Sequence, residues 1–372
     1  MKALTYSFLS VILIAGVSFL AISKEPEAPA PENYPPIVGN ESRLAMASIQ
    51  PRLNLSQAYQ AEFNANFEIA SEYFLISLKR AIIMGEDIEL VASLSGVLKL
   101  FATSRDSEKI DSLRKQISLE SSISIPLGSI LNHLFKSGYA RMDLSNGKYH
   151  EAELLINDCL DFFAPHRHIY PEIYGDLLHL KGLNLHEQNL LEQALGYYNL
   201  ALEFRRGNDS IDHVKRAATL NNIGNVYWKY GDYKRALSFH QMSLEYKRAH
   251  LSEQHPDIAT SHNNIGVLLN DLGQHNQALK YHQIALEHRR QTLGSHISVA
   301  HSLHNIGKSF FFLDQVEEAL ESLEEALEIK LLLLGEEHST YINSLSFLAN
   351  IYSHNGNFKR SYSLLNKAMF LC

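Results

Sequence analysis

The chain of 372 residues is poor in the residue types that cross-link or punctuate a fold. Its two cysteines, Cys159 and Cys372, are too few for a disulfide framework or a cysteine-rich metal site. Of its ten prolines, five lie between residues 26 and 36. Lysine and arginine number 33 against 41 acidic residues, a net charge of −8, which argues against a nucleic-acid partner. With 45% hydrophobic residues, the composition is that of a globular protein.

Motifs of catalysis and of metal binding are also missing. The sequence contains no phosphate-binding G-x-x-x-x-G-K-[ST], no G-x-S-x-G, no dinucleotide fingerprint and no C-x-x-C. Among the 19 histidines, His301 and His304 share a helical face and His296 lies close upstream, but zinc needs further ligands and no H-E-x-x-H is present. We therefore expect neither an enzyme nor a cofactor or metal site.

The N-terminal residues 1–23 predict a targeting or anchoring segment. Lys2 precedes an uncharged run over 3–22, and Ala21-Ile22-Ser23 has the pattern of a signal-peptidase site. As a helix the run would reach roughly 30 Å, enough to cross a bilayer, so a retained anchor is the alternative to cleavage, and a buried core helix is a third. The Pro-rich residues 24–50 predict an extended spacer. We expect an exported (periplasmic or secreted) or membrane-anchored chain with its C-terminal part outside the cytoplasm.

Beyond residue 50 apolar residues recur at the helical period, and a repeat of 42 residues becomes visible. Small residues recur in one column: Ala152, Ala194, Ala236, Ala278, Ala319 and Ser361. A second small column lies twelve residues earlier: Ala140, Gly182, Gly224, Gly266, Gly307 and Ala349. A turn residue lies five earlier: Gly147, Asn189, Gly231, Gly273, Asp314 and Gly356. Small residues let two helices cross closely, and glycine in the turn can adopt the positive φ that ends a helix.

These columns resemble the tetratricopeptide repeat, in the 42-residue variety of kinesin light chains and their bacterial relatives. The matching segments include LNNIGNVYWKYGDYKRALSFHQMSLEYKR (220–248) and HSLHNIGKSFFFLDQVEEALESLEEALEIKLLLLG (301–335). The resemblance implies an all-α, right-handed superhelical α-solenoid of stacked antiparallel helix hairpins, with about seven repeats. Six repeats are expected near 129–164, 171–207, 213–251, 256–293, 297–334 and 338–372, within an array over 129–372. Degenerate helical repeats are expected over 51–128, one of them near 89–120.

The resemblance also implies a function class, because tetratricopeptide arrays bind proteins or peptides in the concave groove lined by their first helices. We expect a scaffold or adaptor; the alternative is a regulatory or sensor subunit that binds a small ligand or signal peptide and controls an enzyme. Asparagine amides suit a groove because they donate to and accept from a peptide backbone. The predicted partner-binding residues are Asn221, Asn225, Trp228, Lys229, Asn263, Asn270, His301, His304, Lys308, Asn343 and Asn350, with Asp176, His179 and His186 further upstream. Alternatively, some asparagines bond neighbouring helices.

Two further features carry predictions. Basic residues recur near the end of each second helix, as Arg205/Arg206, Lys247/Arg248, Arg289/Arg290 and Lys330. They suit the negative end of the helix dipole, or form a basic stripe for an acidic partner. The last helix, roughly Phe358 to Cys372, has apolar residues that the next repeat would normally cover. That end predicts a homodimer or another partner, unless its side chains fold back onto the last repeat.

Overall fold

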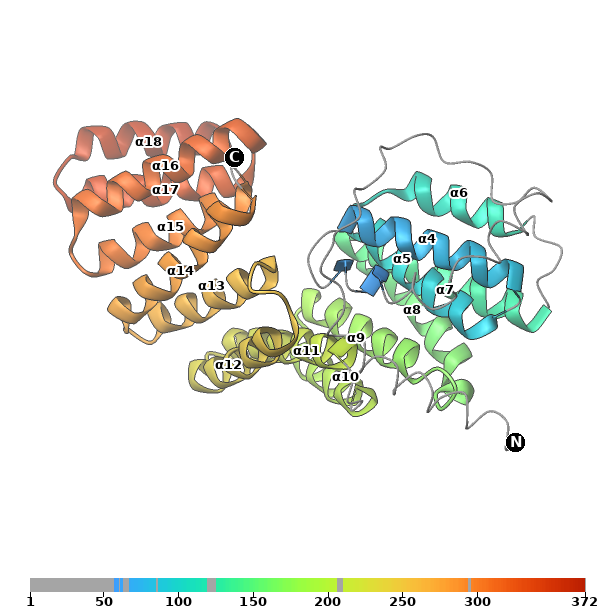
Figure 1. Cartoon of the computed structure of the whole chain (residues 1–372). Helices are drawn as coiled ribbons and strands as arrows, with labels where there is room; N and C mark the ends of the chain where they lie inside the picture. Colours follow the sequence, from blue (N-terminus) through green and yellow to red (C-terminus); the bar gives the residue numbers. More distant parts are fainter. Residues whose placement is uncertain are drawn as a thin grey trace, which may run out of the picture. The chain divides into compact units, whose positions relative to one another are not determined.

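The computed structural model describes residues 57–59, 61–62, 67–84, 86–118, 125–205, 210–293 and 296–371. The predicted targeting segment 1–23, the spacer 24–50 and Cys372 lie outside these residues. The regular elements are helices (Figure 1): α4 (Phe67–Met84), α5 (Asp87–Thr103), α6 (Ser107–Ser118), α7 (Ile125–Ser145), α8 (Tyr149–Phe163), the 3-10 turn η2 (Ala164–His166), α9 (Pro171–Glu187), α10 (Leu191–Phe204), α11 (Ser210–Lys229), α12 (Tyr233–His250), α13 (Pro256–Asp271), α14 (His275–Leu293), α15 (Ile297–Phe312), α16 (Val316–Leu334), α17 (Ser339–His354) and α18 (Phe358–Phe370).

From α7 onward the helices form consecutive hairpins, α7–α8 through α17–α18, and each hairpin packs on the next. The expected all-α solenoid of stacked hairpins is confirmed. Each hairpin turns at the residue that the sequence column indicates. The six turn residues have positive φ of 60–77°, including the non-glycines Asn189 (61°) and Asp314 (60°). At Gly231 the amides of residues 231 and 232 return to the carbonyls of Trp228 and Tyr227, which closes the end of α11.

The two small-residue columns lie where the helices of a hairpin cross. Ala152, Ala194, Ala236, Ala278 and Ala319 are fully buried. A Cβ added to Gly224 would lie 2.8 Å from the ring of His240, and one added to Gly266 would lie 2.6 Å from His282. Only glycine therefore allows these first helices to approach so closely.

Histidines begin three of the first helices. His255, His296 and His338 each precede a helix and accept a hydrogen bond, through Nδ1, from the backbone N–H two residues later, at 3.2 Å. This bond satisfies one of the free amides at a helix N-terminus. A histidine at this position therefore helps to start the first helix of three consecutive repeats.

The upstream region departs from the prediction. The helix α5 packs mainly against α4 and α7, and the short helix α6 touches its neighbours only lightly. The expected helix pair over 89–120 is therefore not a closed hairpin. The reason is that α6 buries only Ile110, Leu113 and Ile117 and exposes most of its other side chains. The predicted start of the array at residue 129 falls inside α7.

Candidate functional site

The first helices α9, α11, α13, α15 and α17 present one partly exposed side, which we call the first-helix face. Counted from the small residue of each helix, the positions three and six before it and one and five after it are exposed or half-buried. The position four after it is accessible too, except in α9, where the predicted residue His186 is buried. These spacings of three and four place the residues along one side of each helix. Most predicted partner-binding residues belong to this face.

Neighbouring first helices are joined across this face by amide side chains. Asn264 Nδ2 donates to Asn221 Oδ1 at 3.2 Å, and Asn305 Nδ2 donates to Asn263 Oδ1 at 3.0 Å. Asn221 Oδ1 also lies 3.1 Å from Nδ1 of His240. Asn270 Nδ2 donates to the hydroxyl of Ser309 at 2.8 Å. Three predicted ligand residues therefore also hold adjacent repeats together, which is the alternative that the sequence left open.

Three other predicted residues make comparable bonds between repeats. Trp228, which is 42% exposed, donates its indole N–H to Asp271 at 2.6 Å. Lys229 donates to the backbone carbonyl of His186 at 3.2 Å, and His304 Nδ1 lies 2.9 Å from the hydroxyl of Ser344. Burial, and then the cations Lys330 and Lys308, lower the pKa of His304 to about 3, so its ring is neutral at physiological pH.

The remaining predicted residues are more accessible. His301, Asn343 and Asn350 are exposed, and Asn225 and Lys308 are half-buried. Burial, and then Lys330, lower the pKa of His301 to about 4. Together with the ladder of amides, these side chains make the first-helix face rich in hydrogen-bonding groups over α11 to α17, with the charges of Lys229, Asp271 and Lys308 among them.

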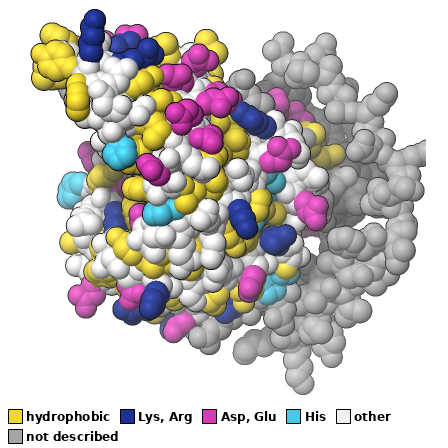
Figure 2. Space-filling model, turned by 90° about the vertical axis from the view of Figure 1, so that its left-hand side faces the viewer, with side chains coloured by type: hydrophobic (Ala, Val, Ile, Leu, Met, Phe, Trp, Pro, Cys, Tyr) yellow, Lys and Arg dark blue, Asp and Glu magenta, His cyan; other side chains and the backbone are white. Residues whose placement is uncertain are grey.

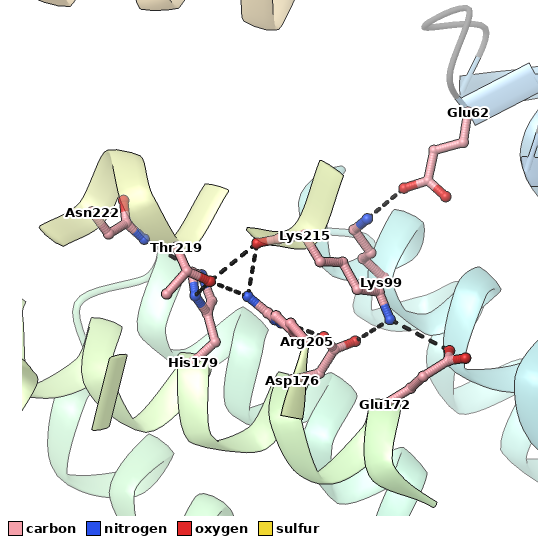
Figure 3. A network of polar contacts seen from close by, with 9 residues as sticks. All are labelled: Glu62, Lys99, Glu172, Asp176, His179, Arg205, Lys215, Thr219 and Asn222. Atoms are coloured by element: carbon pink, nitrogen blue, oxygen red, sulfur yellow. Dashed lines mark hydrogen bonds and ion pairs between the residues drawn. The ribbon is translucent and has the colours of Figure 1, made fainter. Parts of the chain in front are cut away.

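A charged network lies at the other end of this face, between α9 and α11 (Figure 3). Asp176 accepts from Arg205 at 2.7 Å and pairs with Lys215 at 3.1 Å. Burial raises the pKa of Asp176, but Lys215, Arg205 and Arg141 together lower it further, so the net pKa lies well below its usual range. Asp176 therefore stays ionised and holds these cations in place.

Uncharged groups extend the contact between α9 and α11, and a separate ion pair lies on the side of the upstream helix α5. His179 Nδ1 lies 3.1 Å from the hydroxyl of Thr219 and His179 Nε2 lies 3.4 Å from Asn222. Beyond Lys215, Figure 3 places Lys99 of α5, which pairs with Glu62. Asp176 and His179 thus lie on the first-helix face as predicted, but inside a structural ion-pair network.

The recurring basic residues have a role that the sequence did not reveal. Arg205, Lys247, Arg289 and Lys330 are only 3–6% exposed, and each reaches from the end of one hairpin into the first helix of the next. Their hydroxyl acceptors are Thr219, Ser261, Ser302 and Ser344, and each also donates to the carbonyl four residues before that hydroxyl. These inter-repeat cations therefore fasten one repeat to the next, which differs from the expected dipole or stripe role.

The inter-repeat cations differ in how their charge is balanced. Arg205 meets the carboxylate of Asp176, whereas Lys247, Arg289 and Lys330 have no carboxylate partner among the residues that the structure describes. Burial accordingly lowers the pKa of Lys330 to about 8 and that of Arg289 to about 10. The acceptor column could have been found in the sequence, because its members recur at 42, 41 and 42 residues.

A shallow hollow, which the sequence did not predict, lies at the turn between α11 and α12. It has a volume of about 690 Å³ and its lining includes Tyr227, Tyr230, Tyr233 and Arg235. The guanidinium of Arg235 lies 4.5 Å from the centre of the Tyr227 ring and pairs with Asp232. Three of its lining residues, Tyr227, Asp232 and Arg235, are therefore in contact with one another.

Two kinds of feature are absent from the part of the chain that the structure describes. No helix in this part of the chain is both long and apolar enough to cross a bilayer. Within the same residues, no three or more His, Cys, Asp or Glu side chains are grouped so that they could hold a metal ion. Cys159 is fully buried, and burial raises the pKa of its thiol to about 12.

Residues 174–249 and 257–331 match the family model of the tetratricopeptide repeat. These residues, which span α9 to α16, are tetratricopeptide repeats. The predicted resemblance to the tetratricopeptide repeat is confirmed over these residues. No curated protein sequence matches the chain. The family and the fold make it a scaffold for protein–protein interaction.

Solved structures share the fold at low sequence identity. The Cut9–Hcn1 hetero-tetramer of the APC/C aligns at 15% identity over 89% of this chain and 56% of its own, with a TM-score of 0.63. A Rap protein complexed with Competence and Sporulation Factor aligns at 16% identity over 76% of each chain, with a TM-score of 0.57. Kinesin light chain nearly identical TPR-like repeats from Podosopora anserina align at 20% identity over 54% of this chain and 95% of their own, with a TM-score of 0.46.

Proposed function

We propose that this tetratricopeptide-repeat protein is an adaptor that holds an extended segment of a partner protein, or a peptide, against its first-helix face. The observation that carries the proposal is the amide ladder. The oxygens of Asn221 and Asn263 accept from the next repeat, and their Nδ2 groups have no bond to any described residue and are not buried. Two oriented amide donors, 42 residues apart, can therefore bond to backbone carbonyls of a ligand.

The uncharged amides, hydroxyls and imidazoles of this face support a ligand that is held through its backbone. Neither α15 nor α17 contains an acidic residue, and the low pKa values of His301 and His304 keep both rings uncharged. Neutral amides and hydroxyls bond to the backbone of any sequence, so the side chains of the ligand contribute little to its recognition here. Trp228 adds a rigid exposed aromatic surface at the edge of the ladder.

The test compares two matched pairs of substitutions in the full chain. Asn221→Ala with Asn263→Ala removes the donors, while Gln241→Ala with Gln283→Ala changes exposed residues on the second helices α12 and α14, also 42 residues apart. A partner captured from the native cell should bind the glutamine variant like wild type and the asparagine variant at least about tenfold more weakly, since each lost bond contributes about 1–3 kcal/mol. Equal binding of the two variants, with normal melting curves, would rule the first-helix face out.

A second candidate is the regulatory or sensor subunit, whose array binds a free signal peptide or small ligand and controls an enzyme. The same amide donors would hold a free peptide as readily as a segment of a folded partner. The Rap protein, one structural neighbour, was solved in a complex with Competence and Sporulation Factor. The molecule recovered in the capture experiment separates the candidates, because a signal peptide would survive heat treatment and filtration that removes proteins. That the chain itself is not an enzyme stays a prediction in both cases.

Export or membrane tethering is part of the proposal and is supported by the sequence alone. The uncharged run over 3–22 and the Pro-rich tract that follows are its evidence. A reporter that is active only in the cytosol, fused after residue 50, should give no signal, and a reporter that is active only after export should give one. Strong cytosolic activity would refute export.

A further inference from the structure

Four second helices place one large side chain against the glycine of their first helix, and we call these side chains the crossing residues. They are Tyr198, His240, His282 and Leu323, which follow one another at 42, 42 and 41 residues. On the face drawn in Figure 2, histidine side chains reach the surface at scattered points. The crossing residues, in contrast, are at most 2% exposed. Their polar atoms therefore depend on partners within the protein.

The crossing residue His240 bonds to the first-helix face. Its Nδ1 lies 3.1 Å from Oδ1 of Asn221, and the same oxygen accepts from Nδ2 of Asn264 at 3.2 Å. The other crossing residues form no such bond within the described part of the chain. The Tyr198 hydroxyl and both ring nitrogens of His282 are buried without a partner, and a leucine such as Leu323 has no polar side-chain atom. Asn221 is thus held from two sides.

The orientation of the imidazole explains why His240 bonds and His282 does not. A Cβ added to Gly224 would lie nearest to Cδ2 and Nε2 of His240, both at 2.8 Å. One added to Gly266 would lie nearest to Cε1, Nδ1 and Nε2 of His282, at 2.6 to 2.8 Å. His282 therefore turns both nitrogens toward the glycine, whereas His240 turns Nδ1 toward the face. Asn263, the equivalent of Asn221, keeps the single bond from Asn305.

The ring proton of His240 determines which way the Asn221 amide points. An amide oxygen only accepts hydrogen bonds, so Nδ1 of His240 carries the proton and donates it. Burial, and then Lys247, lower the pKa of His240 to about 4, so the ring is neutral at physiological pH and has this one proton. A reversed amide would place Nδ2 of Asn221 against two donors, from His240 and Asn264. Both donors therefore hold the oxygen inward and leave Nδ2 outward.

We propose that His240 is a positioning residue of the first-helix face, which fixes the Asn221 amide with its N–H groups outward. At this position the face then accepts an acceptor of the ligand, such as a backbone carbonyl, and rejects an N–H group. The inference rests on the proposed function and ranks its two donors. Asn221 is oriented before the ligand arrives, whereas Asn263 is held by one bond and loses more freedom on binding.

Nuclear magnetic resonance of the full chain, with 15N-labelled histidine and asparagine, tests the positioning without a ligand. The variants His240→Leu and Asn221→Ala identify the two signals, and His282→Leu is the matched control. Leucine suits the crossing position because Leu323 occupies it in α16. We expect the proton of His240 on Nδ1 and a more rigid side-chain amide in Asn221 than in Asn263.

The two variants should then differ in their effect on Asn221. His240→Leu should make the Asn221 amide as mobile as that of Asn263, while His282→Leu should leave both amides unchanged. A proton on Nε2 of His240, or an Asn221 amide that is equally rigid in wild type and His240→Leu, would overturn the proposal.

Binding provides the second readout, and its probe is the molecule that wild type captures from the native cell and that the Asn221→Ala, Asn263→Ala variant loses. His240→Leu should bind it about three- to tenfold more weakly, the contribution of about one hydrogen bond, and His282→Leu should bind it like wild type. Melting curves of both variants check that the fold is kept. Equal binding of His240→Leu and His282→Leu would refute the positioning role. Capture that survives the loss of both asparagines would instead refute the proposed function, and the resonance experiment would still decide the role of His240.

Discussion

The hairpins α13–α14 and α15–α16 share one backbone plan and differ in the chemistry of equivalent positions. Where the helices cross, Gly266 faces His282 in the first hairpin and Gly307 faces Leu323 in the second. Both nitrogens of His282 are buried without a hydrogen-bond partner, and its side chain is fully buried. The comparison teaches that the fold requires a large side chain against the glycine and does not require a polar one.

The same two hairpins differ again at their junctions with the next repeat and on their first-helix faces. Arg289 lies near the end of the first hairpin, and Lys330 has the equivalent position in the second. Asn263 of α13 is likewise equivalent to His304 of α15. Each pair shows two different residues at the same position of the repeat. Four predictions test these pairs, beginning with the largest effect.

Replacing His282 with leucine, the residue of the other hairpin, should stabilise the protein most. At pH 7 the change removes two unsatisfied buried nitrogens, for a gain of about 1–3 kcal/mol. Burial, and then Lys308 and Arg289, lower the pKa of His282 to about 3. The unfolded chain therefore binds more protons between about pH 6.5 and pH 3, and the wild type loses stability as pH falls through that window, by about 2 kcal/mol more at pH 5.

Urea unfolding at pH 7 and pH 5 measures this effect. The loss in free energy of unfolding from pH 7 to pH 5 should be smaller for His282→Leu than for wild type. The converse change, Leu323→His, is the matched control and should make α15–α16 sensitive to acid. The same loss in free energy of unfolding from pH 7 to pH 5 for wild type and both variants would show that the crossing residue does not determine acid stability.

Adding a methyl group at the crossing should destabilise both hairpins to a similar degree. The Cβ of Gly266→Ala would lie 2.6 Å from the ring of His282, and that of Gly307→Ala would lie 2.7 Å from Cγ of Leu323. We expect each to cost about 1–3 kcal/mol in the free energy of unfolding, because neighbours must move. Gly196→Ala in α10 has open space around its Cβ and should gain about 0.5–1 kcal/mol from helix propensity. If thermal melts showed Gly196→Ala to be as destabilising as Gly266→Ala and Gly307→Ala, the close approach of the two helices at Gly266 and Gly307 would be contradicted.

The contributions of Lys330 and Arg289 to the free energy of unfolding should depend differently on pH above pH 7.5. Burial lowers the pKa of Lys330 to about 8, from 10.5 for a lysine in water, so the unfolded chain binds more protons between these values and stability rises with pH across that window. The free-energy difference between wild type and Lys330→Met should therefore shift in favour of wild type by about 1–2 kcal/mol from pH 7.5 to pH 9.5. The same difference for Arg289→Met should stay flat, since Arg289 titrates only at about pH 10 and above. Parallel curves for the two variants would refute this reading of Lys330.

The smallest effect concerns Asn263 on the first-helix face. Its amide oxygen accepts one bond from Asn305 and its side chain is half-buried, so Asn263→Ala should lower the free energy of unfolding by about 0.5–1 kcal/mol. His304→Ala should lower it more, because the ring packs against Phe347 and lies 2.9 Å from the Ser344 hydroxyl. Chemical denaturation measures both. A loss of several kcal/mol for Asn263→Ala would make its role structural and remove it as a ligand residue.

The first-helix face could be predicted in part. Counting from the small residue of each repeat placed Asn225, Asn343 and Asn350 on accessible positions, because helical periodicity fixes which side a residue takes. It could not show that Asn221, Asn263 and Asn270 also bond to the neighbouring repeat. Those partners lie 39–43 residues away in the chain, and only the stacking of repeats brings them together.

The amino-acid sequence by itself determined the features that depend on local geometry. The turn column marked the six residues that have positive φ, although the sequence predicted this conformation only for its glycines. The small columns predicted the crossings of the hairpins, because both features are set within about 40 residues by helix period and side-chain size. The tertiary structure alone decided how the repeats join, with Arg205, Lys247, Arg289 and Lys330 buried against hydroxyls of the next helix. It also decided that α6 packs only weakly on its neighbours. A basic residue at a helix end can be solvated, can interact with the helix dipole, or can form a buried hydrogen bond. The packing of the next repeat excludes water from these side chains, so they form buried hydrogen bonds.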